Sequence, residues 1–190
     1  MSLFPPASGE ALDEDAFDRE FDAAWAAARS RFFKCEARQA YTEPADPSYQ
    51  AFARGEFAEA RRLVAERIRA QRPMYEEAIG RGLSLTRVRV AEMPLSAYLS
   101  EYELPTYKVS CELGETIRIA TTEALHGDEV GDFLLFDDDV VFVHRHTHEG
   151  VPNGAWRVSG RRAAKPYVRL VERLLSDSQP LDDFLETHTT

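Results

Sequence analysis

The chain has 190 residues, of which 44% are hydrophobic and 29% are charged, ordinary values for a globular protein that can bury a sizeable core. Its 33 acidic and 23 basic residues give a net charge of −10, which disfavours nucleic acid and acidic membranes as partners unless basic side chains gather on one face. No run of 18 apolar residues is present, and the N-terminal region is acidic where a signal peptide would be basic, so we expect a soluble cytoplasmic protein.

The N-terminal part of the chain predicts a tail, a helix and a strand. Residues 1–12 show no periodicity and are expected to be a disordered tail, followed by a single domain over residues 13–187. Apolar residues then recur at four-residue steps, which predicts one stripe of a helix: Phe17, Phe21, Trp25 and Ala28. Alternation between residues 33 and 41 predicts a strand with one wet face. Residues 48–79 favour helix, with interruptions at Gly55 and Pro73.

The remaining elements alternate between strands and helices. Strands are predicted near residues 85–90, 116–120, 133–136, 140–146 and 156–158, and helices near 94–101, 161–176 and 181–186. Asp137, Asp138 and Asp139 favour a tight turn between two strands, although oxygen ligands of this kind also suit Mg²⁺ or Ca²⁺. Asn153-Gly154 is a second turn signal. The order predicts an α+β fold in which a small mixed or antiparallel sheet is covered by helices, including N-terminal and C-terminal ones.

Three histidines alternate along one predicted strand. His144, His146 and His148 stand at i, i+2 and i+4, so an extended backbone would direct all three to one side. Imidazoles in this arrangement can bind zinc or another divalent metal. The alternative is that the strand leaves the core at Val143 and the histidines are solvated. No cofactor is required by any other motif.

Three arginines form a candidate anion site. Arg87 and Arg89 alternate with valines on one strand, and Arg118 of the neighbouring predicted strand is expected to join them across the sheet. Together with Asp132 they are candidate ligand-binding residues, because guanidinium groups bind phosphate and carboxylate in a bidentate manner. The competing interpretation is that the arginines form ion pairs inside the fold with Glu92, Asp132 or Asp137.

Other catalytic signatures are missing from the sequence. There is no glycine-rich phosphate loop and no GxSxG elbow. Cys35 and Cys111 form neither a CxxC pair nor a local catalytic motif, so both are expected to be reduced and inert. Charge is segregated, however, since residues 10–22 are acidic whereas 54–89 and 157–173 are rich in basic residues. Such blocks are solvated faces or a docking surface for an acidic partner.

Five short motifs resemble, in order and spacing, an actinobacterial family of unknown function. They are Arg87-Val-Arg-Val90, Pro94-Leu-Ser-Ala-Tyr98, Gly114-Glu-Thr-Ile-Arg118, Asp132-Phe-Leu-Leu-Phe-Asp137 and Pro180-Leu-Asp-Asp-Phe184. The family pattern is RVRVV, PLSDYL, GEDIRIL and DFWLFDD followed by a C-terminal helix. Its members are often encoded beside helix-turn-helix regulators. The resemblance implies a protein partner, with a transcriptional regulator as the candidate.

The succession of strand, helix, strand and DFxLFD is also similar to half of a phospholipase D-like domain. The HxKxxxxD signature of that family is missing here, because His148 follows His146 at i+2 and no lysine is nearby. This second resemblance therefore implies a degenerate, inactive version of that domain.

Two functions compete on these observations. The first is a non-enzymatic accessory or regulatory protein that acts through protein–protein contacts, since no complete catalytic set is visible. The second is an enzyme that processes a small ligand or a phosphoester, with the arginines binding an anion and His144 or His146 serving as acid or base. Direct binding of nucleic acid or of a membrane is not expected.

Overall fold

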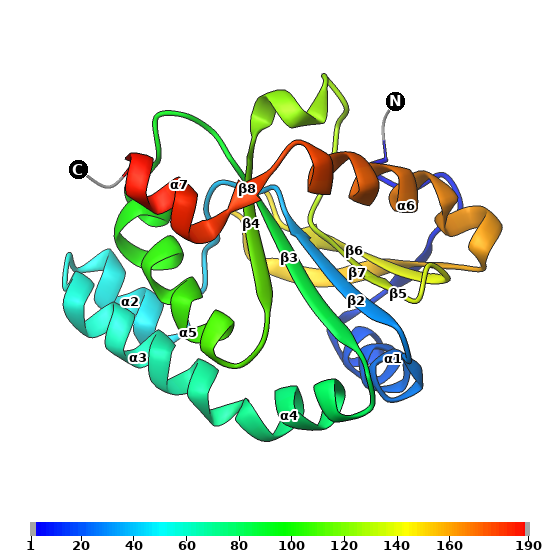
Figure 1. The fold of residues 1–190 in the computed structure, drawn as a ribbon, viewed down its shortest axis with the longest axis horizontal. Coiled ribbons are helices and arrows are strands. Elements are labelled where there is room, and N and C mark those ends of the chain that lie inside the picture. The colour runs from blue at the N-terminus through cyan, green and yellow to red at the C-terminus, as the bar shows by residue number, and fades with distance from the viewer. Residues whose placement is uncertain (1–2, 189–190) are drawn as a thin grey trace.

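The computed structural model describes residues 3–188, which form a mixed eight-stranded sheet covered by helices on both faces (Figure 1). Its order is β1-β7-β6-β5-β2-β3-β4-β8. Only β2, β3 and β4 run parallel to one another, and all other neighbours are antiparallel. The strands are β1 (Glu10–Leu12), β2 (Arg31–Glu36), β3 (Ser84–Ala91), β4 (Thr116–Thr121), β5 (Phe133–Phe136), β6 (Val140–His146), β7 (Pro152–Ser159) and β8 (Gln179–Pro180).

The helices fill the connections between these strands. They are α1 (Glu14–Ala27), α2 (Pro47–Ala53), α3 (Phe57–Ala70), α4 (Arg72–Gly80), the π-helix η1 (Tyr98–Glu103), the 3₁₀ turns η2 (Leu104–Thr106) and η3 (Thr122–Leu125), α5 (Tyr107–Glu112), α6 (Arg161–Ser176) and α7 (Leu181–His188). Among the helices of residues 3–188, none has both the length and the apolar composition that a bilayer crossing requires. The predicted α+β class is confirmed.

The two faces of the sheet carry different cores. One face packs on α6, whose buried residues Tyr167, Leu170 and Leu174 meet Phe133 and Val141 of the sheet. On the opposite face two apolar clusters lie apart, one under α2, α3, α5 and α7 and the other under α1 and α4. The space between those two clusters is where charged side chains of the sheet are covered by helices.

The α1 stripe shows how sequence periodicity becomes packing. Asp13 caps the helix by accepting a hydrogen bond from the backbone N–H of Ala16 at 2.8 Å, which satisfies one of the free donors of the first turn. Phe17, Phe21 and Trp25 then lie against aromatic rings of the sheet, with ring centroids 5.3–5.7 Å apart. The predicted apolar stripe is therefore the surface by which α1 covers the sheet.

Two expectations for the chain termini and turns were wrong. The segment expected to be a tail contains β1, which pairs with β7, and a buried Leu3 whose N–H donates to the carbonyl of Glu129 at 3.1 Å; residues 1–2 lie outside the described part. Asn153-Gly154 is not a turn but belongs to β7. Gly154 has a φ of 79°, and a Cβ there would collide with the carbonyl oxygen of Leu12, so the glycine permits the close approach of β1 rather than a reversal.

The Asp137–Asp139 segment forms the tight turn between β5 and β6, as expected. Asp137 and Asp138 adopt φ values of 47° and 62°, which aspartate tolerates better than most residues. The Asp137 carboxylate accepts hydrogen bonds from the backbone N–H groups of Arg29, Ser30 and Arg31 at 2.7–3.0 Å. Although burial opposes ionisation, these donors lower the pKa of Asp137 to about 2. The turn is thus tied to the start of β2.

Candidate ligand-binding cleft

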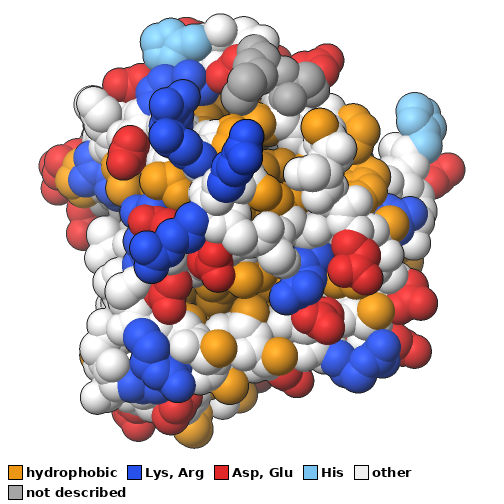
Figure 2. Space-filling model, turned by 90° about the vertical axis from the view of Figure 1, so that its right-hand side faces the viewer, with side chains coloured by type: hydrophobic (Ala, Val, Ile, Leu, Met, Phe, Trp, Pro, Cys, Tyr) orange, Lys and Arg blue, Asp and Glu red, His pale blue; other side chains and the backbone are white. Residues whose placement is uncertain are grey.

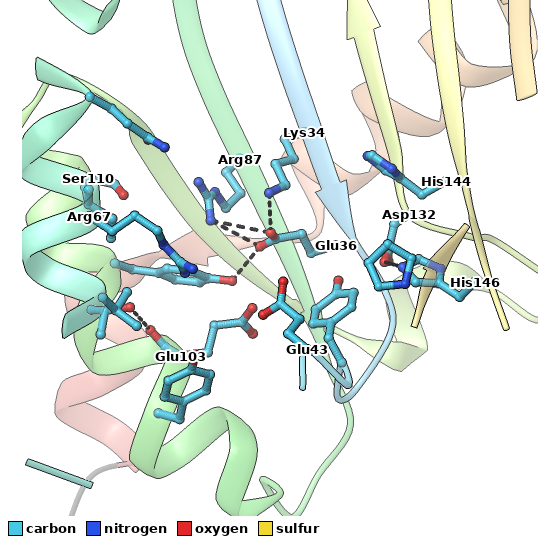
Figure 3. Close-up of a pocket in the computed structure, with 18 of the residues that line it drawn as sticks. Lys34, Glu36, Glu43, Arg67, Arg87, Glu103, Ser110, Asp132, His144 and His146 are labelled. Atoms are coloured by element: carbon cyan, nitrogen blue, oxygen red, sulfur yellow. Dashed lines mark hydrogen bonds and ion pairs between the residues drawn. The ribbon is translucent and has the colours of Figure 1, made fainter. Parts of the chain in front are cut away.

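A cleft of about 490 Å³ opens between the sheet and the helices that cover its charged face. Its floor is formed by side chains of β2, β3 and β6, and its walls by α1, α3, η1 and α5. Figure 3 shows the polar lining residues pointing toward this space. The volume lies within the range of sites that bind small molecules, roughly 300–1,000 Å³.

Strand register explains why charges meet on the floor of the cleft. β2 and β3 are parallel, with Lys34 opposite Arg87 and Glu36 opposite Arg89. Since paired residues share a face and alternate residues repeat it, all four side chains lie on the side of the sheet that faces α3 and α5. The alternating pattern of β2 predicted one wet face, and this face is instead covered by helices.

Arg87 is held between two buried carboxylates. Its Nε and Nη2 donate to the two oxygens of Glu115 at 2.9 and 3.0 Å, and its Nη1 lies 3.4 Å from both oxygens of Glu36. Glu36 also receives the hydroxyl of Tyr107 at 2.5 Å and pairs with Lys34 at 2.7 Å. Burial by itself raises the pKa of Glu36, but the positive charges of Arg87, Lys34 and Arg89 outweigh it and hold that pKa far below its ordinary value.

Arg89 has a weaker partner. Its side chain is fully buried, and its Nε lies 3.2 Å from Oε2 of Glu103. Burial raises the pKa of Glu103 to about 7, with the nearby charge of Glu36 acting in the same direction and Arg89 opposing both. Arg89 also donates to the carbonyl of Arg38 and to the hydroxyl of Tyr41 at 3.3 Å.

The predicted cluster of three arginines does not form. Arg118 lies opposite Val88 in the β3–β4 register, so its side chain is on the other face of the sheet, where it binds Ser178 at 2.8 Å. Arg87 and Arg89 do share a face, but carboxylates already neutralise both. Arg87 and Arg89 thus form ion pairs inside the fold, with Glu36, Glu103 and Glu115 as partners in place of Glu92, Asp132 and Asp137.

Asp132 lies at the opposite end of the cleft from Glu103, beside the histidines (Figure 3). It is 5% exposed, and its Oδ1 accepts the backbone N–H groups of Ala37 and Arg38 at 2.6 and 2.9 Å. Its Oδ2 is buried without a hydrogen bond and lies 3.9 Å from Nε2 of His146. A buried carboxylate oxygen that accepts no hydrogen bond lowers the stability of the fold. Oδ2 of Asp132 is therefore the strongest candidate in the cleft for a contact with a ligand.

Both cleft histidines are neutral at pH 7. Burial lowers the pKa of His144 to about 4, with the charge of Lys34 acting in the same direction. Burial also lowers the pKa of His146, but Asp132 opposes that shift. The His144 ring packs edge-on against Phe17, with centroids 5.2 Å apart. The two imidazoles therefore differ in surroundings: at His146 the main influence that opposes burial is Asp132, whereas at His144 the charge of Lys34 adds to the effect of burial.

The predicted three-histidine metal site is not assembled. A bulge separates His144 from His146, whose ring centroids are 6.4 Å apart, and His148 is exposed beyond the end of β6. Within residues 3–188, no group of three or more His, Cys, Asp or Glu side chains is placed to hold a metal ion. The strand ends too early for the alternation to continue to His148.

Several cleft residues were missed from the sequence because they come from separate segments. Lys34 and Glu36 carried a signal, since charged residues alternate there within a strand. No sequence pattern indicated Glu43, Glu103 or Tyr107. They reach the cleft from a loop, a π-helix and a short helix, and periodicity did not assign these segments to an element.

Fold and site together define an α+β protein with a small-molecule-sized polar cleft on one face of a mixed sheet. The chain belongs to a family described as a domain of unknown function (DUF6879), whose model matches residues 19–186. The expected membership in a family of unknown function is thereby confirmed. No curated protein matches the chain.

Solved structures show a similar fold at very low sequence identity. Nuc from Salmonella typhimurium, a phospholipase D family member, is 9% identical with a TM-score of 0.53, covering 91% of this chain and 97% of that one. The archaeal chromatin protein TrmBL2 and phosphatidylserine synthase from Haemophilus influenzae Rd KW20 are 8% and 5% identical, each with a TM-score of 0.47. Those two matches cover 93% and 90% of this chain but only 56% and 38% of the TrmBL2 and phosphatidylserine synthase chains. The likeness to Nuc extends to the fold alone.

Proposed function

We propose that the chain binds a small organic molecule in the cleft and that His146 acts on it as a general base. The observation that carries this proposal is the Asp132–His146 pair, a buried carboxylate with a free oxygen 3.9 Å from an imidazole. That separation is too long for a hydrogen bond, but catalytic hydrogen bonds are often loose before a ligand arrives. Asp132 is the positioning residue, since its Oδ1 is fixed by two backbone donors.

The roles of the two histidines follow from their surroundings. A general base works best when its pKa is near the operating pH, and a pKa of about 4 disfavours His144. His146 is the imidazole that lies against the carboxylate of Asp132. With Nε2–H directed at Asp132, Nδ1 of His146 is the unprotonated nitrogen that receives a proton from the ligand. The carboxylate then stabilises the imidazolium that forms.

The arginine-based phosphoester hypothesis loses support from the charge of the cleft. Its three cationic lining residues, Lys34, Arg67 and Arg87, all have carboxylate partners within the fold. None is left free to bind a phosphate dianion. The accessory role beside a transcriptional regulator stays a prediction. Figure 2 shows one face of the molecule, on which basic and acidic side chains are interspersed with hydrophobic groups between them.

The Asp132–His146 pair is tested by proton titration. We expect the Asp132→Asn variant to lower the pKa of His146 further, because the carboxylate is the group that opposes its fall. Two-dimensional NMR of the imidazole C–H signals measures this between pH 4 and 8. His148, which is exposed and outside the cleft, serves as the internal control, and its signals should be the same in both proteins. An unaltered His146 pKa in the variant contradicts the assigned role of Asp132.

Ligand binding itself is tested with a fragment library that contains neutral, cationic and anionic compounds. Fragments should perturb the NMR signals of the cleft, and His146→Ala should change those responses whereas His148→Ala should not. If no fragment perturbs the cleft, or if the two alanine variants behave alike, the proposal is wrong.

A further inference from the structure

The cleft carries more negative than positive charge. Three cationic side chains line it, against six acidic ones: Glu14, Asp18, Glu36, Glu43, Glu103 and Asp132. Glu103 is only partly ionised at pH 7, because its pKa is raised to about 7, and the other five still outnumber the cations. The two imidazoles add no positive charge at pH 7, because burial lowers the pKa of each. The potential inside the cleft is therefore negative, and it is strengthened by the poor screening of a partly buried site.

Glu43 is a half-buried carboxylate of the cleft that the fold leaves free, and the more exposed Glu14 and Asp18 are free as well. None of these three carboxylates makes a hydrogen bond or ion pair with the residues that the structure describes. Tyr98 and Tyr102 line the same cleft, and the charges of Glu43 and Glu103 raise the pKa values of both tyrosines, after the larger effect of burial. Figure 3 shows Glu43 and Glu103 directed into the cleft.

Aromatic rings surround these carboxylates. Tyr41, Tyr98 and Tyr102 line this end of the cleft, with Tyr98 6.0 Å from Tyr41 and 5.2 Å from Tyr102 between ring centroids. The protein already places cations over such rings, since the guanidinium carbon of Arg89 lies 5.7 Å from the Tyr41 centroid. Tyrosine faces combined with carboxylates are the usual means of recognising an organic ammonium group.

We infer that the ligand of this cleft is a small organic cation, an amine or quaternary ammonium compound whose positive group sits between Glu43 and the three tyrosines, at the end of the cleft where Glu103 pairs with Arg89. The inference rests on the proposed function and names the class of its ligand. The buried, unpartnered Oδ2 of Asp132 is the second polar feature of the same cleft and marks the end at which His146 would act.

Three probes of nearly equal shape separate charge from size. Benzylammonium, benzyl alcohol and benzoate are titrated into the intact protein at fixed ionic strength and pH 7.5, with dissociation constants taken from NMR signals of the cleft. Benzylammonium should bind about tenfold more tightly than benzyl alcohol, the size expected of one ammonium group in a partly desolvated aromatic and acidic site. Benzoate should bind least.

Glu43→Gln is the decisive variant, because it removes a charge without breaking a contact inside the fold. It should weaken benzylammonium binding by up to about fivefold and leave benzyl alcohol unchanged. Glu101→Gln is the matched control: Glu101 lies on η1 two residues before Glu103 but does not line the cleft, so it should have no effect. Glu103→Gln is less suitable, since it leaves the buried Arg89 without its carboxylate.

The outcomes distinguish the two proposals. Equal or tighter binding of benzyl alcohol or benzoate, absence of benzylammonium from the cleft, or equal effects of the Glu43 and Glu101 variants overturns the cation inference. The proposed function is decided separately, by the fragment library and by the response of His146 to Asp132→Asn.

Discussion

Replacing Arg87 by leucine should lower the free energy of unfolding by about 3–5 kcal/mol at pH 7, the usual cost of removing one partner of a buried ion pair. The side chains of Glu36 and Glu115 are 6% and 2% exposed, and both carboxylates would lose the guanidinium group that now binds them. Lys34 would remain as the cation beside Glu36, but none would remain beside Glu115 among its present ion-pair partners. Chemical denaturation followed by circular dichroism measures the change.

Two comparisons show whether uncompensated charge is the cause. Arg87→Leu combined with Glu115→Leu should recover part of the loss, because an apolar pair replaces a broken ionic one. Arg89→Leu should cost less than Arg87→Leu, since the pKa of Glu103 is already raised to about 7 and its neutral form is readily reached. If Arg87→Leu is no more destabilising than Arg89→Leu, the buried network does not hold the fold in the manner described.

The second large effect concerns acid. His144 has a pKa of about 4 in the folded protein against an ordinary value of 6.5. Between these two values the unfolded chain binds more protons than the folded one, so the free energy of unfolding falls as the pH is lowered through this window. At 1.36 kcal/mol per pKa unit, the 2.5 units between 6.5 and about 4 correspond to a contribution of at most about 3 kcal/mol.

His144→Phe should remove that part of the pH dependence while keeping a ring against Phe17. The measurement is the free energy of unfolding at several pH values from 4 to 7.5, with His148→Phe as the exposed control. Glu103 acts with the opposite sign: its pKa is raised from 4.5 to about 7, so its contribution is full below pH 4.5 and is lost as the pH rises through 7. An unchanged pH profile in His144→Phe would show that the imidazole is not buried in its neutral form.

Much of the fold could be predicted from local patterns. The helix of residues 161–176 was predicted with the bounds of α6, because its apolar residues repeat with helical spacing on one side and its charges lie on the other. The β5–β6 hairpin followed from apolar runs around three aspartates. The strands β1 and β8 were missed, since three and two residues are too few to establish a period.

Some residues of the candidate site could likewise be predicted from the sequence, and others could not. Sequence by itself determined that Arg87 and Arg89 share one strand face and that His144 and His146 are candidates for chemistry, because strand alternation is a local property. Only the tertiary structure decided that Arg118 faces the other side, that His148 is excluded, and that Lys34, Glu43 and Glu103 complete the cleft. Strand register and the approach of distant helices fix those relations, and neither is encoded in a repeat that can be read along one segment.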